Sequence, residues 1–249
     1  MKVGSVIVGL MVSVFTVSSA ANPDNLYGRH AEGKNGVVAA ANPEASKIGV
    51  EVMKKGGNAV DAAVATAFAI SVFEPNASGI GGGGFMLIRM AKTGKTVVID
   101  YREKAPAKAT PDMFVLDENG KVVNDEITVG GKASGVPGTV AGLLTALEKY
   151  GTMKRADVMA PAIKHAGEGI IVSKNLEGII QDNYEKLVKF DAASEVYLKD
   201  GLPYEAGDRL VNKDLAATLT KILKEGKKAF YEGEIAKKIA FVSAVLSKY

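Results

Sequence analysis

The chain has 249 residues, of which 47% are hydrophobic and 24% charged, and this composition excludes a disordered or fibrous protein. Its formal net charge of +3 is too small to attract nucleic acid, so we expect no nucleic-acid partner. The chain has no cysteine and only two histidines, His30 and His165, far apart in the sequence. We therefore expect no disulfide, no cysteine nucleophile, no metal site and no cofactor.

The first twenty residues are typical of a signal peptide. Lys2 precedes an uncharged apolar stretch from Val3 to Val17, and Ser18-Ser19-Ala20 supplies the small residues of a cleavage site. We predict a signal peptide over residues 1–20, a mature chain over residues 21–249, and a periplasmic or secreted location. The alternative is an uncleaved membrane anchor, but the apolar stretch is shorter than the roughly 20 residues of a bilayer span. We therefore expect no stable membrane span.

Two helices are predicted next. Asn42 followed by Pro43 is typical of a helix start, and the pair Gly56-Gly57 predicts the end of that helix. Asn58 then caps a second predicted helix from Ala59 to Val72, in which Asp61 is placed to complete a capping box. Because this second helix is apolar on every side, we expect it to be buried in the core.

A glycine run follows the second helix: five of the six residues from Gly79 to Gly84 are glycine. The run satisfies the spacing G-x-G-x-x-G, but a dinucleotide site needs a strand before the loop and a helix after it, and here the order is reversed. No Lys-Ser or Lys-Thr follows, which excludes a P-loop. The run therefore indicates positive φ angles or a close approach of the backbone, either to packing partners or to a ligand.

Two strands, Phe85–Ile88 and Thr96–Ile99, are predicted to form a hairpin after the glycine run. Asp100-Tyr101-Arg102-Glu103 lies where the second strand ends, a common place for functional side chains. The guanidinium of Arg102 is suited to paired hydrogen bonds with a carboxylate. The alternative is a structural ion pair with Glu103 or a nearby aspartate, and the residues alone do not decide between the two.

We predict that the second half of the chain is mainly helical and that the whole chain after the signal peptide forms one α/β domain. His165 lies in one of these helices among alanines, so we interpret it as a structural residue. The predicted helices are Thr139–Lys149, Ala156–Glu168, Ser173–Val188, Lys213–Glu225 and one that begins at Glu234.

Several blocks of the sequence together resemble the γ-glutamyltranspeptidase family. The similarity extends from about Asn35 to about Ala240. The most specific blocks are Lys55-Gly56-Gly57-Asn58-Ala59-Val60-Asp61-Ala62-Ala63, Gly79-Ile80-Gly81-Gly82-Gly83-Gly84-Phe85, Asp100-Tyr101-Arg102-Glu103-Lys104-Ala105-Pro106 and Gly135-Val136-Pro137-Gly138.

The resemblance implies an N-terminal nucleophile hydrolase, an α/β fold in which two β-sheets pack between helical layers. Such a protein is made as a proenzyme that cleaves itself into a large and a small subunit. The new N-terminal Thr of the small subunit attacks the γ-carbonyl of glutathione or another γ-glutamyl compound, with its own α-amine as the base. In this family the arginine of the R-E-x-A-P block holds the α-carboxylate of the γ-glutamyl group, and the resemblance carries this role to Arg102. It also implies that the glycine run packs a buried loop near the active site.

The nucleophile of the family is not found in this sequence. No Thr is followed by Thr or Ser and then His, so we expect the chain to be a large-subunit portion whose sandwich is incomplete without its small-subunit partner. We therefore predict no catalytic residue in this chain. Two hypotheses stay open: a part of a γ-glutamyl enzyme or a related enzyme such as a cephalosporin acylase, or a non-catalytic binding or interaction protein with the same fold.

Overall fold

The computed structural model describes residues 31–246, with side chains as far as residue 243. The chain divides into two units, residues 1–37 and 38–249. Of the first unit the structure describes residues 31–37, which form neither helix nor strand. The predicted signal peptide over residues 1–20 lies outside the described residues.

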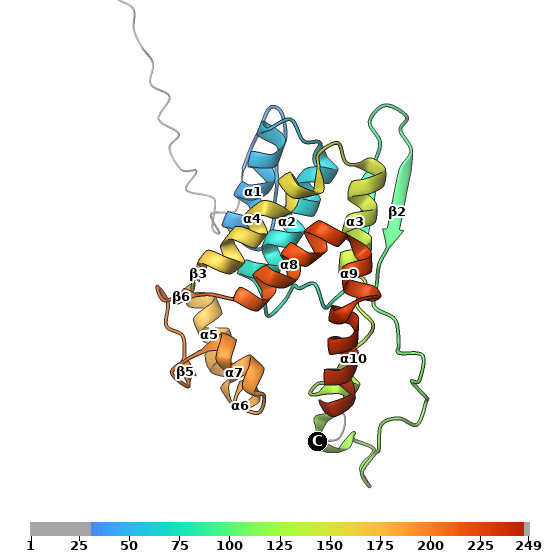
Figure 1. Cartoon of the computed structure of the whole chain (residues 1–249), viewed down its shortest axis with the longest axis vertical. Helices are drawn as coiled ribbons and strands as arrows, with labels where there is room; N and C mark the ends of the chain where they lie inside the picture. The colour runs from blue at the N-terminus through green and yellow to red at the C-terminus, as the bar shows by residue number, and fades with distance from the viewer. Residues whose placement is uncertain (1–30, 247–249) are drawn as a thin grey trace, which may run out of the picture. The chain divides into compact units, whose positions relative to one another are not determined.

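The core of the second unit is centred on helix α2, which has other helices around it (Figure 1). Helix α2 (Ala59–Phe73) packs against α1 (Pro43–Lys54) and α4 (Arg155–Glu168), and α4 packs in turn against α8 (Lys213–Glu225). Eleven of the fifteen residues of α2 are buried, which confirms the prediction that this helix lies in the core. The core is therefore built by an apolar central helix that has neighbours on several sides.

Local sequence signals explain where the first two helices begin. The Asn42 side chain accepts a hydrogen bond from Glu44 N at 2.9 Å at the start of α1. At the start of α2, Asn58 and Asp61 form the predicted capping box, in which Asn58 N donates to Asp61 Oδ2 at 2.8 Å. Each cap satisfies backbone groups that a helix end leaves without partners.

Strands β1 (Phe85–Arg89) and β2 (Thr96–Asp100) form the predicted antiparallel hairpin, with Phe85 opposite Asp100. One face of the hairpin carries Ile88, which is buried, and packs against α3 (Thr139–Tyr150). The opposite face carries Phe85, Leu87 and Val98, which are 60–70% exposed. The hairpin therefore covers α3 with one face and presents apolar side chains to solvent with the other.

The region after α4 differs from its prediction. The single helix expected over Ser173–Val188 is wrong: α5 (Lys174–Asp182) ends at Asn183, and a separate one-turn helix α6 (Tyr184–Leu187) follows. Asn183 leaves the helical conformation with φ −110° and ψ 11°, and its side-chain amide donates to Ile179 O at 2.9 Å. The amide therefore adds a second hydrogen bond to a carbonyl that already accepts from Asn183 N, at a point where the apolar periodicity alone suggested a continuous helix.

The remaining elements are short, apart from the last helix. Strand β3 (Ile170–Ile171) pairs with β6 (Arg209–Leu210), and β4 (Leu198–Lys199) pairs with β5 (Leu202–Pro203), both antiparallel. These four strands and helices α7 and α9 were not predicted from the sequence. Their bounds, with those of the other elements outside the core, are η1 (Val123–Asp125), η2 (Gly131–Ala133), β3 (Ile170–Ile171), α7 (Asp191–Tyr197), β4 (Leu198–Lys199), β5 (Leu202–Pro203), β6 (Arg209–Leu210), α9 (Lys227–Tyr231) and α10 (Glu234–Leu246).

The second unit thus combines helices with three two-stranded sheets among its described residues. This mixed content confirms the predicted α/β class. The hairpin β1-β2 is the longest paired segment, and it leads directly into the residues around Arg102.

Candidate functional site

Arg102 lies two residues after the end of β2, where the chain turns away from the hairpin. The turn is stabilised by Asp100, whose Oδ1 accepts a hydrogen bond from Arg102 N at 3.0 Å. Aspartate commonly makes this local bond to a backbone N–H two residues further on. The side chain of Arg102 is 68% exposed, so its guanidinium is accessible to solvent.

The glycine run lies directly beside this turn. Gly84 N donates to Tyr101 O at 3.3 Å, and Tyr101 N donates to Gly84 O at 2.9 Å, so the hairpin ladder continues one pair beyond the strands. A Cβ atom at Gly83 would lie 2.6 Å from Tyr101 O and 2.7 Å from Glu103 N, closer than van der Waals contact allows. Glycine is therefore required here by a close backbone approach.

The rest of the run does not share this requirement. A Cβ atom at Gly81 would meet nothing within 4 Å, and none of the glycines from Gly79 to Gly84 has positive φ. Gly81 is exposed and the other glycines of the run are half-buried, so the expectation of a buried loop is wrong. The close approach expected from the sequence is confirmed at Gly83 and Gly84 alone.

The start of α3 also contacts the glycine run. Gly138 N and Thr139 N both donate to Gly82 O, at 2.8 and 3.0 Å. Val136 N donates to Lys104 O at 2.8 Å, and Lys104 N returns a bond to Val136 O at 3.3 Å. The three segments that the sequence singled out separately, the glycine run, residues 100–104 and residues 135–138, therefore meet at one place.

Among the described residues, the ion pair of the site joins Arg102 and Glu103. Arg102 Nε lies 3.1 Å from Glu103 Oε2, which confirms the ion pair that the sequence left open as an alternative. The two groups are not aligned as a hydrogen bond, since Oε2 is buried and accepts none among the described residues. Among those residues, the terminal nitrogens Nη1 and Nη2 of Arg102 have no hydrogen bond or ion pair. The guanidinium is thus held on one side and open to an anion on the other.

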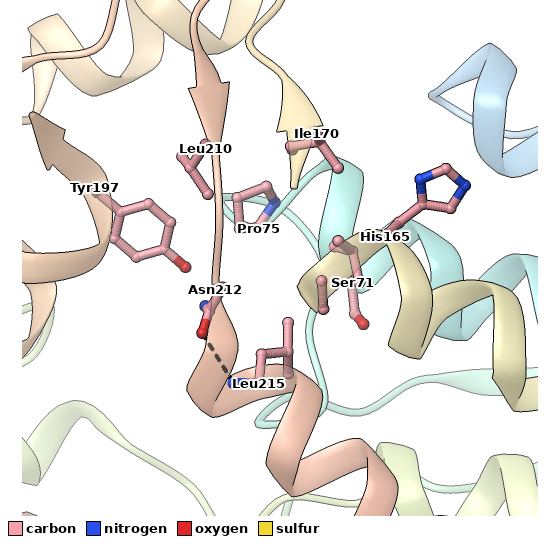
Figure 2. A pocket seen from close by; sticks show the side chains of 10 residues that line it. Ser71, Pro75, His165, Ile170, Tyr197, Leu210, Asn212 and Leu215 are labelled. Carbon is pink, nitrogen blue, oxygen red and sulfur yellow. Dashed lines mark hydrogen bonds between the residues drawn. The ribbon is translucent and has the colours of Figure 1, made fainter. Parts of the chain in front are cut away.

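His165 contributes no catalytic arrangement among the described residues. Its ring lies 5.0 Å from the ring of Phe73, a contact typical of a structural residue. Figure 2 shows the imidazole turned away from the middle of the small cavity that it borders with Tyr197, Asn212 and Leu215. That cavity has a volume of about 10 Å³, room for about one water molecule and too little for a substrate.

Two larger hollows lie elsewhere on the second unit. One of about 380 Å³ lies between residues 128–130 and helices α5 to α7, and one of about 620 Å³ lies between residues 106–113, residues 131–137 and helices α9 and α10. Arg102 lines neither of them. Both linings are mainly apolar and include few side chains that could take part in proton transfer.

Within residues 31–246, no group of three or more His, Cys, Asp or Glu side chains is placed to hold a metal ion. In the same part of the chain, no helix has the length and apolar character needed to cross a membrane. The candidate site is therefore defined by Arg102 and the backbone around it.

Two residues of this site were not predicted from the sequence: Gly142, and Tyr101 in its role as a packing residue. A Cβ atom at Gly142 would collide with the ring of Tyr101. The available signal was a glycine inside a predicted helix, since such a glycine usually has a packing or functional reason.

Comparisons with known proteins agree with the resemblance noted in the sequence. The model of the family described as Gamma-glutamyltranspeptidase matches residues 45–244. The glutathione hydrolase proenzyme of Bacillus subtilis (strain 168) is 48% identical over 227 residues, which cover 90% of this chain and 38% of that protein. The acylase ACY 1 proenzyme of Pseudomonas sp. (strain V22) is 42% identical over 212 residues, which cover 83% of this chain and 38% of that protein.

Solved structures give the same result for the fold. The crystal structure of Helicobacter pylori γ-glutamyltranspeptidase matches with a TM-score of 0.80 and 44% identity, over 84% of this chain and 60% of that one. This match confirms the predicted fold class. The chain thus spans well under half the length of the two proenzymes it matches.

Proposed function

Since the chain belongs to the γ-glutamyltranspeptidase family, we propose that it forms the γ-glutamyl-binding part of an enzyme that acts on glutathione and related γ-glutamyl compounds. In this proposal a Thr from outside these 249 residues attacks the γ-carbonyl carbon, and its own α-amine takes the hydroxyl proton. The C–N bond of the amide breaks, the proton passes to the leaving amine, and a γ-glutamyl ester of the Thr remains. Water, or the amine of an amino acid or peptide, then takes the γ-glutamyl group and frees the Thr.

The role of Arg102 is to hold the α-carboxylate of the γ-glutamyl group. The observation that supports it is the arrangement of its guanidinium, with Nε beside Glu103 Oε2 at 3.1 Å and the terminal nitrogens open. Two parallel N–H donors match the two oxygens of a carboxylate, a geometry that a lysine ammonium does not offer. The carbon of the α-carboxylate lies five bonds from the amide nitrogen. In this proposal Arg102 therefore binds the γ-glutamyl group of the substrate and places no restriction on the amine that is released.

The small subunit that supplies the Thr is the proposed partner, as expected for a proenzyme that cleaves itself. We also propose export from the cytoplasm, which is supported by the signal-peptide pattern of residues 1–20. In an exported protein the substrates are γ-glutamyl compounds outside the cytoplasm.

Binding of L-glutamate by this chain tests the role of Arg102 without requiring the Thr. A paired contact between a guanidinium and a carboxylate contributes about 1.5–3 kcal/mol, but the loss of translational and rotational freedom opposes it, so we expect millimolar or weaker binding. We expect L-glutamate to shift the Nε–Hε NMR resonance of Arg102, and γ-aminobutyrate, which lacks the α-carboxylate, to leave it unchanged. Arg102→Ala removes the binding and Arg102→Lys weakens it. Equal responses to the two ligands, or unchanged binding by Arg102→Ala, contradict the proposal.

A second candidate function is the hydrolysis of an acyl amide that is not γ-glutamyl. It is favoured by the 42% identity to the acylase ACY 1 proenzyme. Glutarate differs from L-glutamate only in the α-ammonium group and therefore separates the two candidates. A preference for glutarate supports the acylase function, whereas a preference for L-glutamate supports the γ-glutamyl enzyme.

A further inference from the structure

Arg102 lies between two residues that are packed, although it is exposed itself. Tyr101 is half-buried, and the side chain of Glu103 is 32% exposed against 68% for Arg102. Backbone positions on both sides of Arg102 are also paired, because Tyr101 bonds to Gly84 and Lys104 bonds to Val136. The peptide that carries the guanidinium is thus fixed on both sides.

The ring of Tyr101 lies between two glycines. A Cβ atom at Gly84 would lie 3.1 Å from Cε2 of the ring and 3.4 Å from Cζ and Oη. On the opposite side, a Cβ atom at Gly142 would collide with Cγ and Cδ1 of the same ring. The ring therefore packs directly on the backbone of α3, with no side chain between them.

Gly138 lies one turn before Gly142 and faces the same residue. A Cβ atom at Gly138 would collide with the carbonyl oxygen of Tyr101. Residues four apart share one face of a helix, so both glycines open the same face of α3 toward Tyr101. Glycine is a poor helix former, and its presence at Gly142, inside the helix, is explained by this contact.

We propose that Tyr101, Gly138 and Gly142 are positioning residues for Arg102, and that the fit of the Tyr101 ring against α3 sets the direction of the guanidinium toward the α-carboxylate. The inference rests on the proposed function. A binding group whose backbone is fixed before the ligand arrives loses less conformational entropy on binding. The glycines act through Tyr101 and do not contact the ligand.

Substitution of Tyr101 tests the proposal with the whole chain and the NMR titration described above. Tyr101→Ala removes the ring and keeps Arg102, and we expect L-glutamate to bind at least about fivefold more weakly. Tyr101→Phe keeps the ring and serves as the matched control, with unchanged binding. γ-Aminobutyrate, which is expected to leave the Arg102 resonance of the unchanged protein where it is, should leave it unchanged in both variants as well. If Tyr101→Ala binds L-glutamate as the unchanged protein does, the proposal is wrong.

A second pair of variants tests the same contact from the side of α3. Gly142→Ala places a methyl group against the ring, and we expect it to weaken L-glutamate binding in the same direction as Tyr101→Ala. Gly178→Ala is the control, since a Cβ atom in that helix would meet nothing within 4 Å. If Gly142→Ala does not fold, the result with Tyr101→Ala decides alone.

The variants also separate this proposal from the function on which it rests. If Arg102→Ala itself leaves L-glutamate binding unchanged, the proposed function fails. If Arg102→Ala removes binding while Tyr101→Ala and Gly142→Ala do not change it, the positioning role alone fails. A merely structural role lowers the melting temperature of the variants but leaves the preference for L-glutamate over γ-aminobutyrate intact. A smaller preference for L-glutamate in folded variants is the result we expect.

Discussion

The Thr152 hydroxyl donates a hydrogen bond of 2.7 Å to Asp61 Oδ2, although 91 residues separate the two in sequence. The same fully buried carboxylate accepts bonds from the backbone N–H groups of Asn58, Thr152 and Met153. It thereby joins the start of α2 to the segment between α3 and α4. Burial raises the pKa of Asp61, but the bonds from Thr152, Asn58 and Met153 outweigh it and leave the pKa below its usual value.

Asp61→Asn is expected to lower the free energy of unfolding by about 2 kcal/mol or more. The amide keeps the size of the side chain but replaces one acceptor oxygen with a donor, which faces N–H groups that then have no partner. Urea denaturation at neutral pH measures the change. Asp214→Asn is the control, since Asp214 is also in the first turn of a helix but is exposed, and it should change stability by only a few tenths of a kcal/mol, as roughly expected for an exposed helix end.

The contribution of Asp61 depends on pH in a direction set by its lowered pKa. Because the carboxyl binds a proton more weakly in the folded than in the unfolded chain, its stabilisation is fully present above the unfolded pKa of about 3.9 and decreases as the pH falls below it. The difference in unfolding free energy between the unchanged protein and Asp61→Asn should therefore be constant from pH 7 to about 5 and shrink toward pH 3. A difference that grows on acidification contradicts the assignment.

Tyr231→Phe is expected to destabilise the start of α3. The Tyr231 hydroxyl donates to Pro137 O at 3.0 Å and accepts from Ala141 N at 3.1 Å, while Gly138 at the start of the helix offers no side-chain cap. Burial raises the pKa of Tyr231, partly offset by the Ala141 N–H, so the phenol stays protonated at neutral pH. Loss of the hydroxyl should cost about 1–2 kcal/mol by urea denaturation. Tyr184→Phe, which removes an exposed hydrogen bond, should cost less.

Gly49 and Thr66 should show coupled effects on stability. A Cβ atom at Gly49 in α1 would collide with Thr66 Oγ1 in α2, and that hydroxyl is buried with no hydrogen bond among the described residues. Gly49→Ala should therefore destabilise, and Thr66→Ala should remove much of the collision. A double-mutant cycle should give a coupling energy of about 1 kcal/mol or more. Strict additivity of the two substitutions would show that the helices adjust elsewhere.

The exposed face of the hairpin should govern self-association of the chain. Leu87 and Val98 lie opposite each other on this face and are 70% and 60% exposed. The double substitution Leu87→Lys with Val98→Thr should lower concentration-dependent light scattering, because it reduces an apolar patch beside unpaired strand edges. The free energy of unfolding should hardly change. Ile88→Thr, on the buried face, should instead destabilise the chain without this gain.

Much of the fold followed from local signals in the sequence. The caps at Asn42 and Asn58 and the hairpin strands depend on neighbouring residues, and all three predictions are confirmed. The long-range role of Asp61 could not be predicted, because Thr152 and Met153 are distant in sequence. The break at Asn183 was missed for a different reason, since the apolar periodicity continues through it.

The candidate site was predictable in part. Residue type and a strand end pointed to Arg102, and its placement beside Glu103 agrees with one of the two readings of that pattern. The packing of Tyr101 against Gly142 is a tertiary contact: a glycine inside a predicted helix indicates a close neighbour, but the local sequence does not say which residue that neighbour is. Only the three-dimensional fold brings α3 against the end of β2.

The alternation of packed and exposed residues at positions 101–103 has a consequence for how this segment changes during evolution. Tyr101 and Glu103 pack closely against the glycines around them, so the fold constrains these two positions whether or not the protein binds anything. Packing places no such demand on Arg102, which is 68% exposed. In lineages that lose the ligand, position 102 is therefore free to drift while its two neighbours stay constant. An arginine retained there across divergent descendants would record selection for binding, separately from selection for folding.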